Sequence, residues 1–324
     1  FKQKTAYEIM PSLVGSEMCI RDRISSSNNK LRNNTASRND IGVYLVGSSY
    51  NILGNNNVSN NYRGIYLGFS SNNILRGNTV SFNGDYGIRL ADSSSNNTLM
   101  NNTVSSNVHG IFFTGQDQYS WIPSNNTLIY NNVANNDIGI WLYSSSNNNI
   151  ANNNCSNNDD GILLTSSGNN NLENNNCSNN DYGICLAWAG NNRIENNKCN
   201  SNNYYGIHHY SSSNSIIIGN TFEKCGITIY GYSIEYTNTH TVENNMVNGK
   251  PIYYYKNTEG IIVPEDAGQV IIANCSNMVV KNINASSASI GIELAYTINS
   301  IIENNTCSNN KRGVDLLSSS NNNI

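Results

Sequence analysis

The fold is decided by the stretch Tyr62-Arg-Gly-Ile-Tyr-Leu-Gly-Phe-Ser-Ser-Asn-Asn-Ile-Leu-Arg-Gly-Asn-Thr-Val-Ser-Phe-Asn83, because near-copies of it run almost from one end of the chain to the other. Its Gly-Ile step, or a Gly-Val variant, recurs at Gly42, Gly64, Gly87, Gly110, Gly139, Gly161, Gly183, Gly206, Gly291 and Gly313. Most neighbours in this series lie 22 or 23 residues apart. A period of about 20 to 50 residues is typical of solenoids and propellers, so the repeat must be interpreted before any single motif.

Each unit carries the pattern of short strands. Apolar residues alternate with polar ones at Ile65 and Leu67, recur at Leu75 and Val80, and are separated by Ser, Asn and Gly clusters. Nothing in the unit has the spacing or length of a helix. Three strands and three turns fit into one unit, whereas a propeller blade needs about 40 residues. The sequence therefore predicts an all-β, single-stranded parallel β-helix with about 22 residues per coil and about 13 coils.

Two ladders are expected inside this β-helix. One repeat position is Asn at 56, 78, 102, 131, 153, 175, 197, 220 and 305, so these amides would stack about 4.8 Å apart and hydrogen-bond along the stack. Cys155, Cys177, Cys199 and Cys307 share a position that is Val in other units. We interpret them as buried free thiols, and disulfides or a metal site as the alternatives; the sequence has no C-x-x-C pair.

The consensus Gly-Ile-x-Leu-x-x-Ser-Ser-x-Asn-Asn-x-Leu-x-x-Asn-x-Val/Cys resembles the right-handed parallel β-helix (PbH1) repeat of NosD-like and related carbohydrate-binding/sugar-hydrolase (CASH) domain proteins. The resemblance covers nearly all of residues 24–324. It implies a right-handed helix and an exported protein, in the periplasm, outside the cell or on its surface. The NosD name is tied to copper delivery during maturation of nitrous oxide reductase. The shared motif consists mainly of core and turn residues, so it indicates a fold and does not fix an activity.

The chain divides into four segments by its pattern. Residues 1–23 share nothing with the repeat; their end resembles translated adaptor sequence, and the alternatives are a disordered segment or an N-terminal cap. Regular repeats fill 24–225, divergent coils are expected over 226–290, and regular repeats return over 291–324. An insertion near 115–123 predicts a loop. Because the repeat begins and stops in mid-unit, we expect further coils or caps outside this sequence.

Composition argues against two classes of partner. The net charge of −4 and the pI near 5.6 give no basic surface for nucleic acid. The longest apolar runs are far shorter than the roughly 20 residues that cross a bilayer.

The strongest candidate for a binding surface is a row of outward side chains between the buried Ile and Leu of each unit. This row and a second one two residues further on contain Tyr44, Tyr66, Arg89, Phe112, Trp141, Tyr143, His208, Tyr210 and Tyr230. Exposed rings in a row suit stacking against the apolar faces of sugars. Aromatic residues also favour exposed strands for packing reasons alone, so a structural role stays open.

A second candidate is an acidic ladder before the recurring glycine. Asp137, Asp159 and Asp181 occupy one position on three successive coils, and Asp160 lies beside them. Carboxylates about 5 Å apart repel each other unless they are protonated or bridged by a cation such as Ca²⁺. The alternative is that these Asp residues only favour the turn conformation and are fully solvated, with no bound cofactor.

Two further activities have weaker support. Glu293 and Asp315 share the outward position on adjacent coils, which is the spacing of a retaining glycosidase pair, and a polysaccharide lyase, hydrolase or epimerase is therefore one alternative. For copper, His208 and His209 point to opposite faces of a strand, so only His208 with Cys185 on the preceding coil could share an ion. The leading hypothesis is a non-catalytic surface module that interacts with other molecules or binds a polysaccharide or cell-surface glycan.

Overall fold

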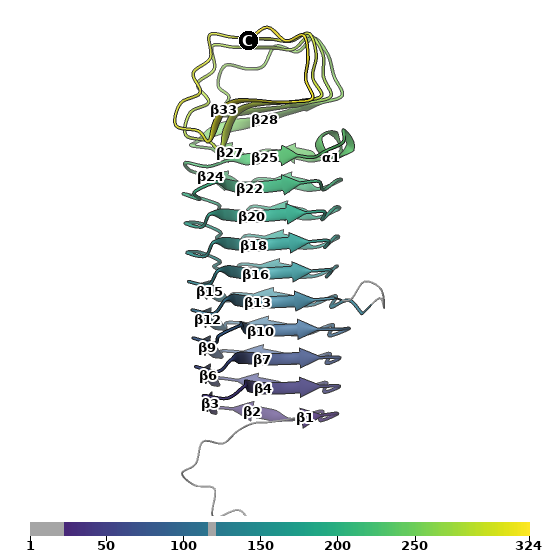
Figure 1. The fold of residues 1–324 in the computed structure, drawn as a ribbon, viewed down its shortest axis with the longest axis vertical. Coiled ribbons are helices and arrows are strands. Elements are labelled where there is room, and N and C mark those ends of the chain that lie inside the picture. Colours follow the sequence, from purple (N-terminus) through teal and green to yellow (C-terminus); the bar gives the residue numbers. More distant parts are fainter. Residues whose placement is uncertain (1–22, 116–120) are drawn as a thin grey trace, which may run out of the picture.

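The protein is a right-handed parallel β-solenoid of about 13 coils with almost no helix, as the sequence predicted. The computed structural model describes residues 23–115 and 121–324, so residues 1–22 and most of the expected loop near 115–123 lie outside the described residues. Figure 1 shows a long stack of coils below and a shorter group of coils, turned relative to it, at the C-terminal end.

The regular coils form three parallel sheets. Sheet 1 has the longest strands, β1 (Arg23–Ile24), β4 (Ile41–Val46), β7 (Arg63–Gly68), β10 (Tyr86–Ala91), β13 (His109–Thr114), β16 (Ile138–Tyr143), β18 (Asp160–Thr165), β20 (Tyr182–Ala187), β22 (Tyr205–Tyr210) and β25 (Ile227–Tyr230). Sheet 2 contains β2 (Lys30–Arg32), β5 (Ile52–Gly54), β8 (Ile74–Arg76), β11 (Thr98–Met100), β14 (Thr127–Ile129), β17 (Asn149–Ala151), β19 (Asn171–Glu173), β21 (Arg193–Glu195), β23 (Ile216–Ile218) and β26 (Thr241–Glu243). Sheet 3 contains β3 (Thr35–Ser37), β6 (Asn57–Ser59), β9 (Thr79–Ser81), β12 (Thr103–Ser105) and β15 (Asn132–Ala134).

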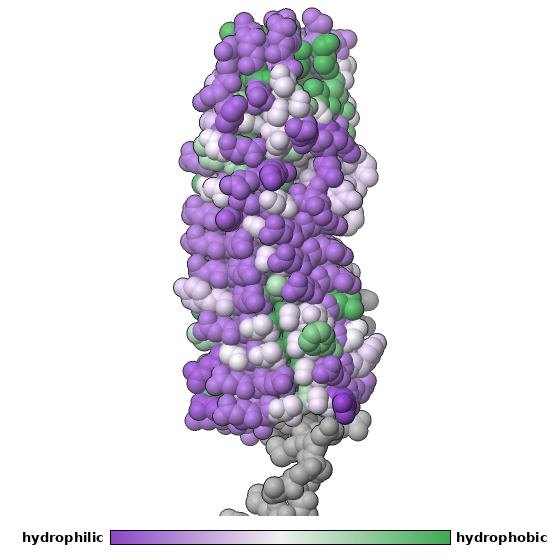
Figure 2. Space-filling view, turned by 90° about the vertical axis from the view of Figure 1, so that its left-hand side faces the viewer, coloured by the Kyte–Doolittle hydropathy of each residue, from purple (hydrophilic) through white to green (hydrophobic). Residues whose placement is uncertain are grey.

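Each coil buries one thin layer of apolar side chains. In the coil of β7, Ile65 and Leu67 from sheet 1, Leu75 from sheet 2 and Val80 from sheet 3 are all completely buried. The sheet 3 position becomes Cys155, Cys177 and Cys199 further on, and these are buried free thiols as expected, whereas Cys307, the fourth predicted member, is a free thiol that is only half-buried. Outside this core, Figure 2 shows a largely hydrophilic face of the molecule with scattered apolar patches.

Each regular coil turns at four corners where the backbone takes a positive φ, one more turn than the sequence predicted. Around β8 and β9 these corners are Phe69 (φ 50°), Asn72 (φ 58°), Gly77 (φ 62°) and Phe82 (φ 55°). Asn and Gly tolerate this left-handed conformation better than other residues do. This preference accounts for the first Asn of the many Asn-Asn pairs.

The second residue of each pair points inward and builds a ladder. Asn78 Oδ1 accepts hydrogen bonds from the backbone N–H and the side-chain amide of Asn56, at 3.0 and 2.9 Å. Its own amide donates to the carbonyl of Leu53 and to Asn102 Oδ1. The predicted ladder is therefore confirmed from residue 56 to residue 220 and continues to Asn245. Two more run beside it through Asn51, Asn73 and Asn97, and through Asn61, Asn83 and Asn107.

The solenoid is interrupted after the tenth strand of sheet 1. Helix α1 (Glu235–Asn238) follows β25, and β24 (Thr221–Phe222) pairs with β27 (Met246–Val247). The chain then reverses through Asn248 (φ 51°) and Gly249 (φ 76°), so that β27 and β28 (Lys250–Lys256) are antiparallel. Two central residues with positive φ define the type I′ hairpin that Asn-Gly favours.

We call residues 23–247 the first stack and residues 250–324 the second stack. The second stack contains a sheet of β28, β29 (Gln269–Ala273), β31 (Ile290–Ala295) and β33 (Arg312–Leu317), here called sheet 4, and a pair of β30 (Val279–Lys281) and β32 (Ile301–Glu303). It has a buried core of its own. In Figure 1 the coils of the first stack are seen edge-on and those of the second as open loops, so the coil axis turns at the junction.

Candidate ligand-binding face

The outward face of sheet 1 presents three parallel rows of side chains. The middle row, which the sequence predicted, is in register through Tyr44, Tyr66, Arg89, Phe112, Trp141, Leu163, Cys185 and His208. A second row two residues further on contains Tyr143, Tyr210 and Tyr230. Both predicted rows thus lie on one face, and the strand spacing of about 4.8 Å sets the distance between neighbours.

The rings of the middle row stack on one another in the first coils. Tyr44 and Tyr66 are 5.2 Å apart between ring centroids with an interplanar angle of 20°, and Phe112 and Trp141 are 4.6 Å apart at 19°. The guanidinium of Arg89 lies between these pairs, 5.8 Å from the Tyr66 ring centre and 5.3 Å from that of Phe112. These contacts give a nearly continuous π surface that is stiffened by ring and cation–π packing.

A third row was missed by the sequence analysis. It consists of the residues directly before the recurring glycine and contains Tyr86, His109, Asp160, Tyr182 and Tyr205. His109 packs against Phe112 and Trp141 at 5.3 and 5.1 Å, and burial lowers the pKa of its imidazole. Aromatic residues recur at this position in the sequence, directly before the recurring glycine, and this repetition could have identified the third row.

An exposed aromatic cluster lies at the other end of the face. Tyr210 and Tyr230 stack in parallel at 5.8 Å and 9°. Trp188 packs edge-on to Tyr210, and Tyr232 packs edge-on to both tyrosines and shares a 2.9 Å hydroxyl contact with Tyr210. Trp188 and Tyr232 are 59% and 72% exposed. The repeat pattern predicted neither ring, because Trp188 lies in the corner after β20 and Tyr232 lies between β25 and α1, both outside the strands.

His208 lies among aromatic rings of the same face. Its imidazole stacks on Tyr182 at 5.5 Å and lies 4.9 Å from the Tyr205 ring. Burial, together with the charge of Arg312, lowers the pKa of His208 to about 4, so the ring is neutral at neutral pH. Its Nδ1 is 3.8 Å from the Sγ of Cys185, the pair that the sequence offered for copper.

The predicted acidic ladder is in register at one edge of this face. The N–H of Asp159 donates to the carbonyl of Asp137 at 2.9 Å, and that of Asp181 donates to the carbonyl of Asp159 at 2.8 Å. Asp160 instead belongs to the third row, and burial together with the charges of Asp159 and Asp181 raises its pKa to about 6. Over residues 23–115 and 121–324 no group of three or more Asp, Glu, His or Cys side chains is arranged to hold a metal ion.

The expected carboxylate pair has a different environment from the one the sequence suggested. Glu293 and Asp315 are neighbours in register on β31 and β33. Glu293, however, is only 4% exposed, because the outward side of sheet 4 rests on the end of the first stack. Its carboxyl group accepts hydrogen bonds from the N–H of Ile229 and the hydroxyl of Thr228, both at 3.2 Å. A glycosidase nucleophile must reach its substrate, so the structure does not support this pair as a hydrolytic site.

The junction brings basic residues of the second stack beside Tyr204 and Tyr205 at the start of β22. The ammonium group of Lys311 lies 4.5 Å from the centre of the Tyr204 ring. Arg312 forms an ion pair with Asp315, and its charge also acts on Tyr205 and His208. Tyr205, His208 and Arg312 are thus close in space although about 100 residues separate them along the chain.

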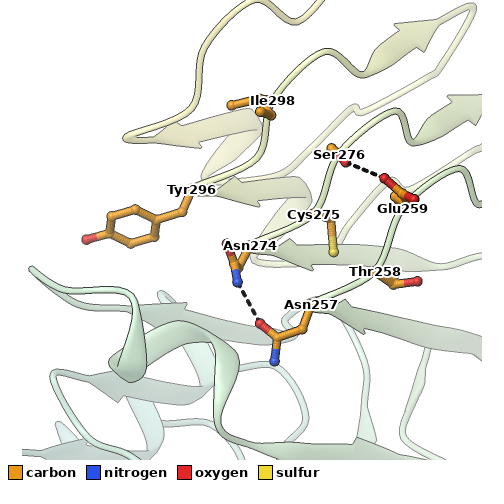
Figure 3. Close-up of a pocket in the computed structure, with 8 residues that line it drawn as sticks. All are labelled: Asn257, Thr258, Glu259, Asn274, Cys275, Ser276, Tyr296 and Ile298. Atoms are coloured by element: carbon orange, nitrogen blue, oxygen red, sulfur yellow. Dashed lines mark hydrogen bonds between the residues drawn. The ribbon is translucent and has the colours of Figure 1, made fainter.

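The second stack has a broad polar hollow of about 620 Å³ (Figure 3). Asn274 donates to Asn257 Oδ1 at 2.7 Å, and the hydroxyl of Ser276 is 3.5 Å from Glu259. Figure 3 shows the Tyr296 ring directed away from the other residues. The hollow is lined by Asn257, Thr258, Glu259, Asn274, Cys275, Ser276, Tyr296 and Ile298. It offers hydrogen bonds but neither a ring platform nor paired catalytic groups.

Comparison with known proteins agrees with the repeat. The model of the family "Periplasmic copper-binding protein (NosD)" matches residues 20–154. The model of the family "Right handed beta helix region" matches residues 119–266. No curated protein sequence matches the chain. No helix among the described residues is long and apolar enough to span a bilayer.

Several solved structures have a similar fold at low sequence identity. A mutant of the periplasmic alginate epimerase AlgG has a TM-score of 0.50 and 16% identity, over 92% of this chain and 70% of that one. XylC in complex with xylose has a TM-score of 0.53 and 12% identity, over 86% of this chain and 54% of that one. The A-module of a mannuronan C-5 epimerase from Azotobacter vinelandii has a TM-score of 0.48 and 15% identity, over 92% and 74% of the two chains. The chain is therefore a right-handed parallel β-helix repeat protein with a NosD-like sequence over residues 20–154.

Proposed function

We propose that the outward face of sheet 1 binds a polysaccharide and that the protein acts as a non-catalytic glycan-binding module outside the cytoplasm. The observation that carries this proposal is the alignment of rings in register along sheet 1, from Tyr44 to Trp141 and again at Tyr210 and Tyr230, with Trp188 packed edge-on to Tyr210 from the corner after β20. Stacked sugars present one apolar C–H face to an aromatic ring, and rings that are already fixed lose little entropy on binding.

The spacing of the face also suits a polymer. Neighbouring strands repeat about every 4.8 Å, so a chain lying along the stack meets equivalent side chains at regular intervals. The description of NosD as periplasmic supports a location outside the cytoplasm. Two proteins with a similar fold are the alginate epimerase AlgG and XylC, whose structure contains xylose, and this agrees with a carbohydrate ligand.

The proposal is tested by electrophoresis of the whole chain through gels that contain different soluble polysaccharides. We expect retardation by at least one polymer without its degradation. Trp188→Ala should reduce this retardation severalfold, since it removes a 59% exposed ring from the cluster. The matched control is Tyr130→Ala, because Tyr130 is equally exposed at 59% and also has a positive φ, but lies in a corner after sheet 2. Equal mobility of both variants and the wild type in every gel would rule out this face as the binding surface.

One observation favours an enzyme that acts on uronate polymers as a second candidate. His208 is a neutral imidazole at neutral pH, and it contacts the phenol of Tyr205 near the guanidinium of Arg312. A base, an acid and a cation are the groups that could remove a proton next to a sugar carboxylate. Release of unsaturated products or a change in uronate composition, lost in His208→Gln, would favour this enzyme over a binding module.

A further inference from the structure

Sheet 2 carries a pair of arginines on its outward side, away from the aromatic face. Arg32 on β2, Gly54 on β5 and Arg76 on β8 occupy the same register position on three successive coils. Both arginines are exposed, and the glycine between them is buried. Two strand spacings of about 4.8 Å separate the arginine backbones, which is within reach of two long side chains.

The two arginine side chains lean over the glycine from opposite sides. A Cβ atom on Gly54 would lie 3.6 Å from Cγ of Arg32 and 4.0 Å from both Cγ and Nε of Arg76. The hollow between them has a volume of about 350 Å³, and the amide residues Asn55 and Asn101 also line it. The absence of a side chain at residue 54 therefore keeps this space open between two cationic groups.

No described carboxylate neutralises these two like charges. Among the described residues neither Arg32 nor Arg76 forms an ion pair with a carboxylate, whereas Arg63, Arg193 and Arg312 each do. Like charges held close together destabilise each other, and an anion between them would remove that cost. Guanidinium groups bind carboxylates and sulfates through paired hydrogen bonds, and amide N–H groups add further donors.

The charge pattern along the chain also favours an anion at this end. Residues 24–115 contain six Lys and Arg against three Asp and Glu, whereas residues 131–192 contain five Asp and Glu and no Lys or Arg. The row that begins with Arg32 and Arg76 continues through Met100, Ile129 and Ala151 to Glu173 and Glu195. An acidic ligand is thus attracted to the first coils and repelled further along the same sheet.

We propose that Arg32, Gly54 and Arg76 form a binding site for the sulfate or carboxylate group of an acidic glycan. The site lies on another sheet from the aromatic face, so it does not depend on the function proposed for that face. Asn55 and Asn101 also line this site.

The proposal is tested by calorimetric titration of the whole chain at low salt with dextran sulfate, polygalacturonate and uncharged dextran. We expect the two charged polymers to bind, with an affinity that falls as salt is added. In the double variant Arg32→Gln/Arg76→Gln the affinity should fall at least tenfold, and Gly54→Leu should weaken binding because its side chain fills the hollow. The control Arg193→Gln removes an arginine from the same sheet that is already paired with Glu195, and it should leave binding unchanged.

Competition with inorganic sulfate distinguishes the sources of the anion. Displacement of dextran sulfate by millimolar sulfate supports a site for single free anions, and resistance to it supports recognition of groups carried by a polymer. Circular dichroism confirms that each variant is folded. The proposal is overturned if the double variant binds dextran sulfate as tightly as the wild type, or if Arg193→Gln weakens binding equally. Loss of glycan binding on sheet 1 through Trp188→Ala would leave this result unaffected.

Discussion

At the scale of single residues, the high asparagine content reflects two different requirements at each corner. Asn152 has a φ of 56° and is exposed, whereas Asn153 is buried with its amide fully hydrogen-bonded. The first position needs a residue that tolerates left-handed backbone, and the second needs a side chain that is both donor and acceptor. A bulky residue at a corner, such as Trp188 with a φ of 52°, has a backbone strain of about 1–3 kcal/mol. Packing against the neighbouring coils must offset this strain.

The cysteine ladder gives a prediction at the same scale. Cys177 is completely buried between Cys155 and Cys199, and burial raises the pKa of its thiol. Since Val133 and Val104 fill the equivalent place in earlier coils, Cys177→Val should change the free energy of unfolding by less than about 1.5 kcal/mol. Cys177→Ser should cost more, because it buries a hydroxyl among apolar groups. Urea denaturation followed by circular dichroism measures both.

The thiols also report on packing. In the folded protein Cys155, Cys177 and Cys199 should resist alkylation, while Cys185 and Cys307, which are half-buried, should react first among the cysteines that the structure describes. Rapid labelling of Cys177 under native conditions would contradict the buried ladder.

At the scale of elements, the asparagine ladders tie each short strand to the next coil. The strands of sheets 2 and 3 have three residues each, so most of them bury a single large apolar side chain. The ladder amides supply hydrogen bonds at the corners, where the strand pairing stops. Their contribution comes mainly from satisfying polar groups that are already buried.

The two residues of one pair should therefore respond differently to substitution. Asn153→Ala removes the acceptor for the N–H and side-chain amide of Asn131, so it should lower the free energy of unfolding by about 1–3 kcal/mol. Asn152→Gly should be close to neutral, because glycine adopts positive φ without steric cost. Asn152→Ala should cost about 1 kcal/mol through backbone strain. Chemical denaturation of the three variants checks the order, and an equal loss in Asn153→Ala and Asn152→Gly would contradict the account.

At the scale of the whole molecule, three side chains of the second stack close the exposed edge of sheet 1. Ser289 accepts from the N–H of Gly226, Gln269 bonds both the N–H and the carbonyl of Ile227, and Glu293 accepts from the N–H of Ile229. These side chains take the place of a further strand. They prevent the open edge from pairing with other chains.

Docking of the two stacks should depend on pH through Glu293. Burial raises the pKa of this carboxyl group from 4.5 to about 8 in the folded protein, and the nearby charge of Asp315 adds to the effect, whereas Arg312 and the bonds to Ile229 and Thr228 oppose it. The folded state therefore holds a proton that the unfolded state releases near pH 4.5. The contribution of Glu293 to the free energy of unfolding is therefore fully present below pH 4.5. It declines by up to about 1.4 kcal/mol per pH unit as the pH rises toward 8.

Glu293→Gln is the variant that isolates this dependence. Its amide can accept from Ile229 and donate to Thr228 without any titration, so the melting temperature should fall less between pH 5 and pH 8 than that of the wild type. The control Glu243→Gln changes an exposed carboxylate of β26 and should leave the wild-type pH profile unchanged. Parallel pH profiles of the wild type and Glu293→Gln would show that the junction does not titrate in this range.

The sequence alone determined the coil, its length and the inward-facing residues, because these follow from local periodicity and repeat in every unit. It also determined that Tyr66, Phe112, Trp141 and His208 share one row, since a fixed period places equivalent residues in register. Only the tertiary structure decided what lies beside that row. The Asn248-Gly249 hairpin redirects the coil axis, which buries Glu293 and brings Arg312 toward Tyr205. Such contacts join residues that are far apart in the chain and depend on one local reversal, so no repeating pattern in the sequence records them.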